Sequence, residues 1–128
     1  MTQEIKGLLQ KSRHAIKVSQ HLLVQGYPSD AASKSYYAMF YAAQALLKSA
    51  NIDVVKHSAV ESAIGYHFVK TGNMDPKYHR MLIDARKLRE VADYDTQEEI
   101  VRPQAAVKIQ EAKDFLQLVQ KILRGNKK

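Results

Sequence analysis

The residues best suited to chemistry lie in the stretch RKLREVADYD, residues 86–95. Arg86, Arg89 and Asp93 are spaced at i, i+3 and i+7, which places them near one another on a helix, and Arg89 and Asp93 can form an ion pair. An arginine can hold a phosphate through two parallel hydrogen bonds, which a lysine cannot copy. Arg86, Arg89, Asp93 and Tyr94 are therefore candidates for an anion-binding or catalytic site. The alternative is a structural ion pair that fixes the helix end and the following loop.

A second group of candidates is the run of aromatic residues in SKSYYAMFYAAQALLKS, residues 33–49. Its large apolar side chains recur at helical spacing on one face: Tyr36, Met39, Phe40, Ala43, Leu46 and Leu47. Tyr37 and Tyr41 fall on a neighbouring face. Either all of these tyrosines belong to the core and its rim, or Tyr37 and Tyr41 line a ligand pocket or an interface. A buried phenol needs a hydrogen-bond partner in either case.

His57 lies just before the expected start of the third helix, at an end whose free N–H groups attract anions. It is either part of a site or an exposed loop histidine. The histidines of the chain show neither a Glu-x-x-His nor a His-Glu-x-x-His spacing, so no metal site is predicted. Glycine-rich phosphate loops and a serine in a nucleophile elbow are also missing, and the sequence predicts no cofactor.

The composition fits one domain that spans residues 1–128, with a frayed basic tail at about residues 124–128. Twenty Lys and Arg residues against thirteen Asp and Glu residues give a formal charge of +7, which favours polyanions such as RNA, DNA or nucleotides as partners. Cysteine is absent and no window is apolar enough to span a membrane. These features lead us to expect a cytoplasmic protein.

Glycine and proline divide the chain into helical segments and leave no strand pattern. The first helix should end in a left-handed cap at Gly26, and the second should begin at Pro28 and fade around Asn51. Residues 58–61, Ser-Ala-Val-Glu, match a capping box that opens a third helix closing at Gly72.

The C-terminal half continues this pattern. Asp75 and Pro76 are a strong start signal for a fourth helix, and DYDTQEE, residues 93–99, interrupts its periodicity. Thr96 and Glu99 offer another capping box, and Pro103 starts or restarts the last helix. Short connections between long amphipathic helices favour antiparallel neighbours. We therefore predict an all-α, up-and-down antiparallel bundle of four to five helices.

Several of these pieces together resemble the HEPN domain, in particular its small stand-alone prokaryotic members. The pieces are D-x-A-x-x-x-YYAMFYAAQALL, a histidine at position 57, HFVKTG and LREVADYD, and the resemblance covers about residues 29–115. It implies a helical bundle that usually dimerises and handles nucleotides or RNA. Many HEPN proteins are metal-independent endoribonucleases that act as toxins, often with a minimal nucleotidyltransferase partner as antitoxin.

The chain departs from the active members of that family at one motif. Those members carry an arginine, four to six further residues and a histidine; the arginine steadies the phosphate and the histidine transfers the proton. No histidine follows any arginine at this spacing here, and Asp93 and Tyr94 stand where one is expected after Arg89. A phenol is a poor general base at neutral pH, so the resemblance transfers the fold and the dimer better than the activity.

Three functions follow from these observations. The favoured one is a dimeric module that binds RNA, a nucleotide or a nucleotidyltransferase partner around Arg89, with Tyr37 and Tyr41 supplying stacking or hydrogen bonds. The alternative is an endoribonuclease with an altered site, in which Arg89 holds the phosphate and His57 or Tyr94 moves protons. The third is a structural homodimer whose charge serves only solubility.

Overall fold

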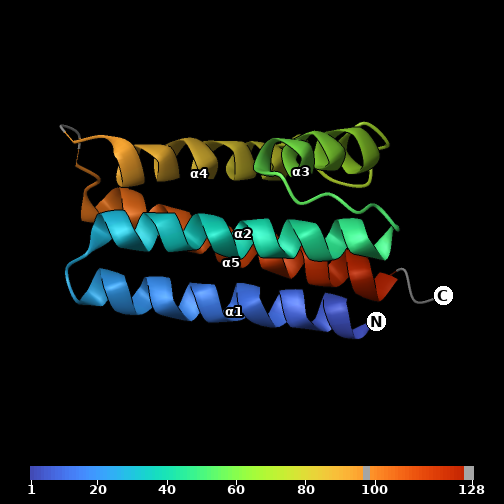
Figure 1. The fold of residues 1–128 in the computed structure, drawn as a ribbon, viewed down its shortest axis with the longest axis horizontal. Coiled ribbons are helices and arrows are strands. Elements are labelled where there is room, and N and C mark those ends of the chain that lie inside the picture. Colours follow the sequence, from blue (N-terminus) through green and yellow to red (C-terminus); the bar gives the residue numbers. More distant parts are fainter. Residues whose placement is uncertain (97–98, 126–128) are drawn as a thin grey trace.

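The protein is an antiparallel helical bundle in the computed structural model, which describes residues 1–96 and 99–125 (Figure 1). Those residues contain no strand. The elements are α1 (Gln3–Val24), α2 (Pro28–Ser49), α3 (His57–Ile64), a π-helical turn η1 (Gly65–Val69), α4 (Pro76–Tyr94) and α5 (Arg102–Gly125). The predicted fold class is confirmed, with five α-helices in the described part of the chain.

Helix α2 occupies the centre of the bundle and packs against α1, α3, α4 and α5. Successive long helices run in opposite directions, as Figure 1 shows for α1, α2, α4 and α5. The alanine stripe of α2, formed by Ala38, Ala42 and Ala45, is completely buried. Ser12 of α1 donates its hydroxyl hydrogen to the Ala38 carbonyl over 2.7 Å. Small side chains let the two helices approach closely enough for that bond.

The predicted helix ends at Gly26 and Asp75 are confirmed. Gly26 adopts a φ of 92°, and the N–H groups of Gly26 and Tyr27 bond back to Leu23 and Leu22, which closes α1 in a Schellman motif. The Asp75 carboxylate accepts a hydrogen bond from the Lys77 N–H and caps α4. Helix α2 begins at Pro28 as expected and ends at Ser49, two residues before Asn51.

The prediction of a capping box at residues 58–61 is wrong. Helix α3 begins at His57, two residues earlier than an N-cap at Ser58 implies, and its N-cap residue Lys56 makes no side-chain capping bond. Glu61 cannot serve as a cap because its carboxylate forms an ion pair with Arg86 of α4. His57 is therefore the first residue of the helix rather than a loop residue.

The last helix begins at Arg102, with Pro103 in its first turn as expected. Gln104 accepts a hydrogen bond from the N–H of Val101, which secures this start. The capping box expected at residues 96–99 includes residues 97–98, which lie outside the described residues. Of the tail expected to fray, residues 124 and 125 belong to α5, and the rest lies outside the described part. No helix in residues 1–96 or 99–125 is long and apolar enough to cross a membrane.

The segment between α2 and α3 decides where His57 lies. Asn51 takes a left-handed conformation with a φ of 61°, and the chain then doubles back along α2 (Figure 1). Ile52 and Val54 pack partly buried against the core and hold this segment down. Helix α3 thus starts beside the middle of α2, where it buries Val60 and Ile64.

Candidate functional site

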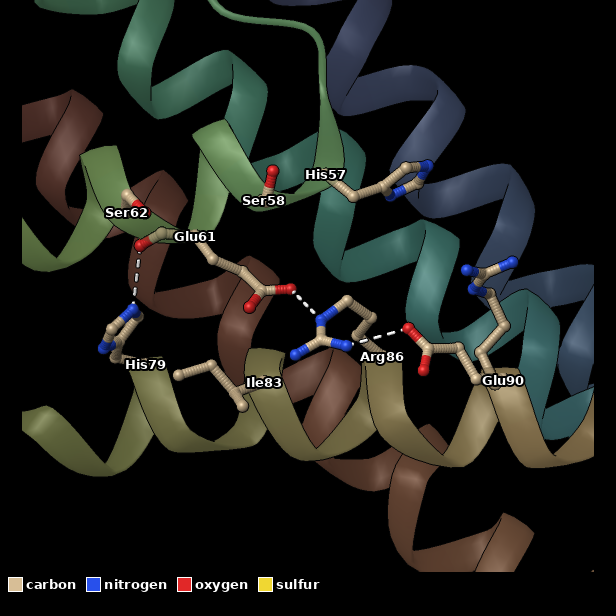
Figure 2. A pocket seen from close by; sticks show the side chains of 9 residues that line it. His57, Ser58, Glu61, Ser62, His79, Ile83, Arg86 and Glu90 are labelled. Atoms are coloured by element: carbon tan, nitrogen blue, oxygen red, sulfur yellow. Dashed lines mark hydrogen bonds and ion pairs between the residues drawn. The ribbon is translucent and has the colours of Figure 1, made fainter.

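A pocket of about 500 Å³ opens between α3 and α4 (Figure 2). Helix α3 contributes His57, Ser58, Glu61 and Ser62. Helix α4 contributes His79, Ile83, Arg86, Arg89 and Glu90. The pocket therefore combines two arginines, two carboxylates and two histidines, which is the set of groups needed to bind a polar, charged ligand.

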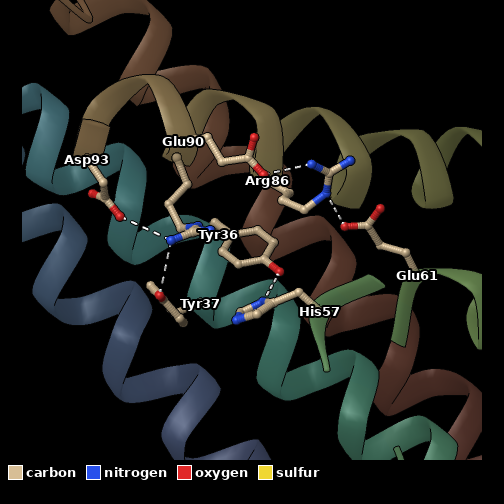
Figure 3. Close-up of polar contacts among 8 residues, drawn as sticks. Tyr36, Tyr37, His57, Glu61, Arg86, Glu90 and Asp93 are labelled. Carbon is tan, nitrogen blue, oxygen red and sulfur yellow. Dashed lines mark hydrogen bonds and ion pairs between the residues drawn. The ribbon is translucent and has the colours of Figure 1, made fainter. Parts of the chain in front are cut away.

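Arg89 is the most enclosed cation of this pocket, with only 12% of its side chain exposed. Its Cζ atom lies 5.4 Å from the ring centroid of Tyr36 and 5.7 Å from that of Tyr37, both on α2. Its Nη1 atom lies 3.2 Å from Asp93 and 3.4 Å from the Tyr37 hydroxyl (Figure 3). Its Nε atom is buried and has no hydrogen-bond partner among the described residues. Aromatic faces thus replace some of the hydration that the guanidinium loses on burial.

His57 lies against the same aromatic group. Its Nδ1 atom is 2.5 Å from the hydroxyl of the completely buried Tyr36, and its ring stacks on Phe40 with centroids 4.3 Å apart. Burial, and then the positive charge of Arg89, hold the pKa of His57 below its ordinary value. Burial, and then the negative charge of Glu61, raise the pKa of Tyr36, so the phenol stays protonated at neutral pH.

This hydrogen bond leaves two arrangements of the His57 proton. If the Tyr36 hydroxyl donates to Nδ1, the neutral imidazole carries its hydrogen on Nε2 and can donate to an anion. If Tyr36 accepts from Nδ1–H, Nε2 has a free lone pair and can accept a proton from a nucleophile. The first arrangement suits binding, and the second suits general base catalysis.

Two bonds of Glu61 attach α3 to α4 (Figure 2). The Glu61 carboxylate accepts a hydrogen bond from Arg86 Nε over 2.5 Å, and Arg86 Nη1 reaches Glu90 over 2.8 Å. The backbone carbonyl of Glu61 lies 2.8 Å from His79 Nε2. Gly65, at the start of the π-helical turn, leaves room for His79, because a Cβ there would lie 3.0 Å from its ring. We call Glu61, Arg86 and His79 the clamp.

The clamp sets the position of His57 relative to Arg89. Helices α3 and α4 run in opposite directions, so the residue one turn before Glu61 lies near the residue one turn after Arg86 (Figure 1). Those residues are His57 and Arg89. The separation of the candidate histidine and arginine is thus determined by contacts between two helices and not by the spacing within one.

The remaining predicted site residues lie at different distances from Arg89. Asp93 pairs with Arg89, as its spacing suggested. Tyr94 is 73% exposed, with its ring centroid 5.9 Å from Arg89 Cζ. Tyr37 bonds Arg89, whereas Tyr41 lies one turn farther along α2 and packs under Lys11 of α1, whose Nζ atom is 5.5 Å from the ring centroid. None of Asp93, Tyr94, Tyr37 and Tyr41 is a wall residue of the pocket.

Of the three clamp residues, the sequence patterns pointed only to Arg86. Glu61 looked like part of a helix cap, and His79 matched no metal spacing. A further signal was that Arg86 and Glu90 are four residues apart on α4, which is the spacing of an ion pair within a helix. Among the described residues, no group of three or more His, Cys, Asp or Glu side chains could hold a metal ion.

Comparison with known proteins identifies the family. The HEPN domain model matches residues 5–127. A Gloeobacter violaceus protein named "UPF0332 protein glr0978" is 32% identical over 96% of this chain and 98% of its own length. Two Methanocaldococcus jannaschii proteins, named "Putative toxin MJ0142" and "Putative toxin MJ0605", are 31% and 30% identical over 94% and 95% of this chain and 82% and 90% of their own lengths. The chain belongs to the HEPN domain family.

Proposed function

We propose that this protein is a binding module of the toxin–antitoxin type that holds the phosphate of RNA or of a nucleotide between Arg89 and His57. The observation that carries this proposal is the burial of Arg89. Only 12% of its side chain is exposed, and its Nε–H group has no hydrogen-bond partner among the described residues. Such a position costs desolvation energy, which the Asp93 carboxylate at 3.2 Å and the Tyr37 hydroxyl at 3.4 Å only partly offset. An anion in the adjacent pocket would offset the rest.

The surroundings of Arg89 support an anionic ligand. The His57 imidazole can donate from Nε2 into the same pocket when Tyr36 donates to Nδ1. The formal charge of +7 attracts a polyanion to the protein as a whole. The two relatives named as putative toxins agree with a role in a toxin–antitoxin pair.

The partners belong to the same proposal. We infer that two copies of the chain form a dimer and that a minimal nucleotidyltransferase acts as the antitoxin, as in the HEPN proteins that this sequence resembles. The half-buried Tyr37, which bonds Arg89, would stack on or bond to the ligand, and the exposed Tyr94 would lie at the rim. Tyr41 would contribute to an interface.

The test is a titration of fluorescent single-stranded RNA at two salt concentrations. Arg89→Ala should weaken binding by about tenfold or more and reduce the salt dependence by about one phosphate contact. Arg80→Ala is the matched control, because Arg80 is an exposed arginine of the same helix and its replacement changes the net charge equally. Urea unfolding of each variant confirms that it is folded. Equal affinities and equal salt slopes for Arg89→Ala and Arg80→Ala would refute the proposal.

The hydrogen bond between His57 and Tyr36 favours one second candidate, a metal-independent endoribonuclease. Here Arg89 would hold the scissile phosphate, while His57, with Nε2 unprotonated, would accept the proton of the attacking 2′-hydroxyl. A gel assay with end-labelled RNA compares the wild type with His57→Gln and Arg89→Ala. Cleavage by the wild type that both variants lose would support it, and the same background in all three proteins would eliminate it.

A further inference from the structure

One side of α1 and one side of α5 carry a row of basic residues. The residues of these two rows are Lys6, Arg13 and Lys17 on α1 and Arg102, Lys113 and Arg124 on α5. Their spacing is i, i+7 and i+11 on α1 and i, i+11 and i+22 on α5, so each row falls on one side of its helix. Five of the six residues are exposed, and Lys113 is half-buried. We call the six residues the cationic face.

The two rows lie side by side, because α1 and α5 pack together and run in opposite directions (Figure 1). Arg102 donates a hydrogen bond over 2.9 Å to the backbone carbonyl of Leu23, near the end of α1, so its row faces α1. Both helices rise about 1.5 Å per residue, and the step along α5 from Arg102 to Lys113 therefore equals a step of the same length back along α1. This places Lys113 beside the middle of α1, at the level of Arg13.

The carboxylates of α1 and α5 bond elsewhere. The one acidic residue of α1, Glu4, pairs with Lys48 of α2 over 2.8 Å. Helix α5 has two acidic residues: Glu111 pairs with Lys108, and Asp114 accepts a hydrogen bond from a glutamine one turn earlier. Within residues 1–96 and 99–125, no residue of the cationic face forms an ion pair. Its six positive charges are therefore available to an anionic partner.

The extent of the cationic face suits a polymer. The row from Arg102 to Arg124 is about 33 Å long, which is more than a single nucleotide occupies. Exposed glutamines, among them Gln10 and Gln117, lie between the cations, and their amide groups can donate hydrogen bonds to phosphate and 2′-hydroxyl oxygens. The apolar stripes of both helices are buried in the core, so this face has no apolar stripe to insert into a lipid surface.

The absence of aromatic side chains from this face favours base-paired RNA over unpaired RNA. Helix α1 contains no Phe, Tyr or Trp, and the one aromatic residue of α5, Phe115, is completely buried. Proteins that hold unpaired bases usually stack them on aromatic rings. Base-paired RNA, in contrast, is recognised mainly through its phosphates and 2′-hydroxyl groups.

We propose that the cationic face is a second RNA-binding surface, which holds the phosphate backbone of base-paired RNA and does not read its bases. Helix α2 separates this surface from the pocket, since α1 packs against α2 and α5 and not against α3 or α4. The two sites also differ in design. Arg89 is enclosed by aromatic rings, whereas the cations of this surface lie open to solvent in two rows.

Fluorescence anisotropy with a labelled RNA duplex of about 20 base pairs tests the surface. In the triple variant Arg13→Gln/Lys17→Gln/Lys113→Gln the affinity should fall about tenfold or more at low salt. Each lost phosphate contact lowers the slope of log K against log salt by about 0.9, so the slope should fall by about 2 to 3.

The matched control is Lys70→Gln/Arg80→Gln/Lys87→Gln, which removes three exposed cations outside the cationic face and changes the net charge equally. This control should lose less than about threefold in affinity, since only the long-range attraction is reduced. Circular dichroism confirms that both triple variants are folded. Equal losses of duplex affinity in the two variants would refute the cationic face, because net charge alone would then explain the binding.

Two further outcomes concern the kind of RNA and the relation to the proposed function. If single-stranded RNA of the same length depends on the cationic face as strongly as the duplex does, the assignment of base-paired RNA is overturned. If Arg89→Ala weakens duplex binding as much as the triple variant does, there is no separate second surface. If duplex binding is lost in the triple variant while single-stranded RNA binding is insensitive to Arg89→Ala, the cationic face stands and the proposed function fails.

Discussion

Replacing Arg86 by methionine should destabilise the fold, because Arg86 is the partner of a carboxylate that is nearly out of solvent. Methionine keeps most of the volume and removes the charge. Glu61 has only 12% of its side chain exposed, so without Arg86 its negative charge has few other sources of stabilisation. Breaking a fully buried ion pair costs about 3–5 kcal/mol, and the partial exposure of Arg86 lowers our expectation to about 2.5 kcal/mol. With an unfolding entropy of about 2.1 cal/mol/K per residue, this loss lowers Tm by about 9 °C.

The same reasoning predicts that a second substitution restores stability. In Arg86→Met/Glu61→Leu the buried charge is gone together with its partner, and apolar side chains fill the space. Replacing both members of a buried pair is often neutral, whereas replacing one is costly. The double variant should therefore be at least about 1 kcal/mol more stable than Arg86→Met alone, although it carries one more change.

Urea unfolding followed by circular dichroism measures both effects. Arg80→Met is the control, since Arg80 is exposed on the same helix and should shift the free energy of unfolding by no more than about 0.5 kcal/mol. The reasoning about the clamp is refuted if Arg86→Met behaves like this control. It is also refuted if the double variant is less stable than the single one, because Glu61 would then stabilise α3 without Arg86.

Two further predictions concern His57 and the glycines. Burial holds the pKa of His57 below its ordinary value of 6.5, so the unfolded chain takes up the proton first, and the free energy of unfolding should fall as the pH drops from about 7 to 5. His57→Gln should flatten this part of the pH dependence measured by urea unfolding. An unchanged slope in the variant would contradict the burial of His57. Gly7→Ala meets nothing within 4 Å and should stabilise α1 by about 0.5–1 kcal/mol, whereas Gly65→Ala places its Cβ 3.0 Å from the His79 ring and should lose that benefit. Equal gains in the melting temperatures of the two alanine variants would show that His79 is not held against Gly65.

The helices and most of their ends could be predicted because their causes are local. A proline after Asp75, a glycine at position 26 and an apolar stripe in α2 act within a few residues, and the structure agrees with each. The ion pair of Arg89 with Asp93 was also within reach, since four residues of helix bring the two side chains together. Arg86 was singled out because it precedes Arg89 by three residues and Asp93 by seven, which places the three residues near one another on a helix.

The partners of these residues on α3 could not be predicted, because they depend on the path of residues 50–56. No periodicity in that segment indicates that it runs back along α2. The start of α3 beside Tyr36, and with it the bond from His57, follows from that path. The capping box predicted for residues 58–61 is absent for a different reason, because the Glu61 carboxylate pairs with Arg86 of α4.

The assembly of the site from two helices has a consequence for how it works. Where an arginine and a histidine share one helix, the turns of that helix fix their separation. Here Arg89 lies on α4 and His57 on α3, and the short helix α3 is attached to α4 by the two bonds of Glu61. The proposed phosphate site therefore depends on Arg86, which bonds Glu61 and so holds α3 in place. An anion that draws Arg89 and His57 together would stabilise the same placement of α3, so loss of the clamp should weaken ligand binding even where no ligand atom touches it.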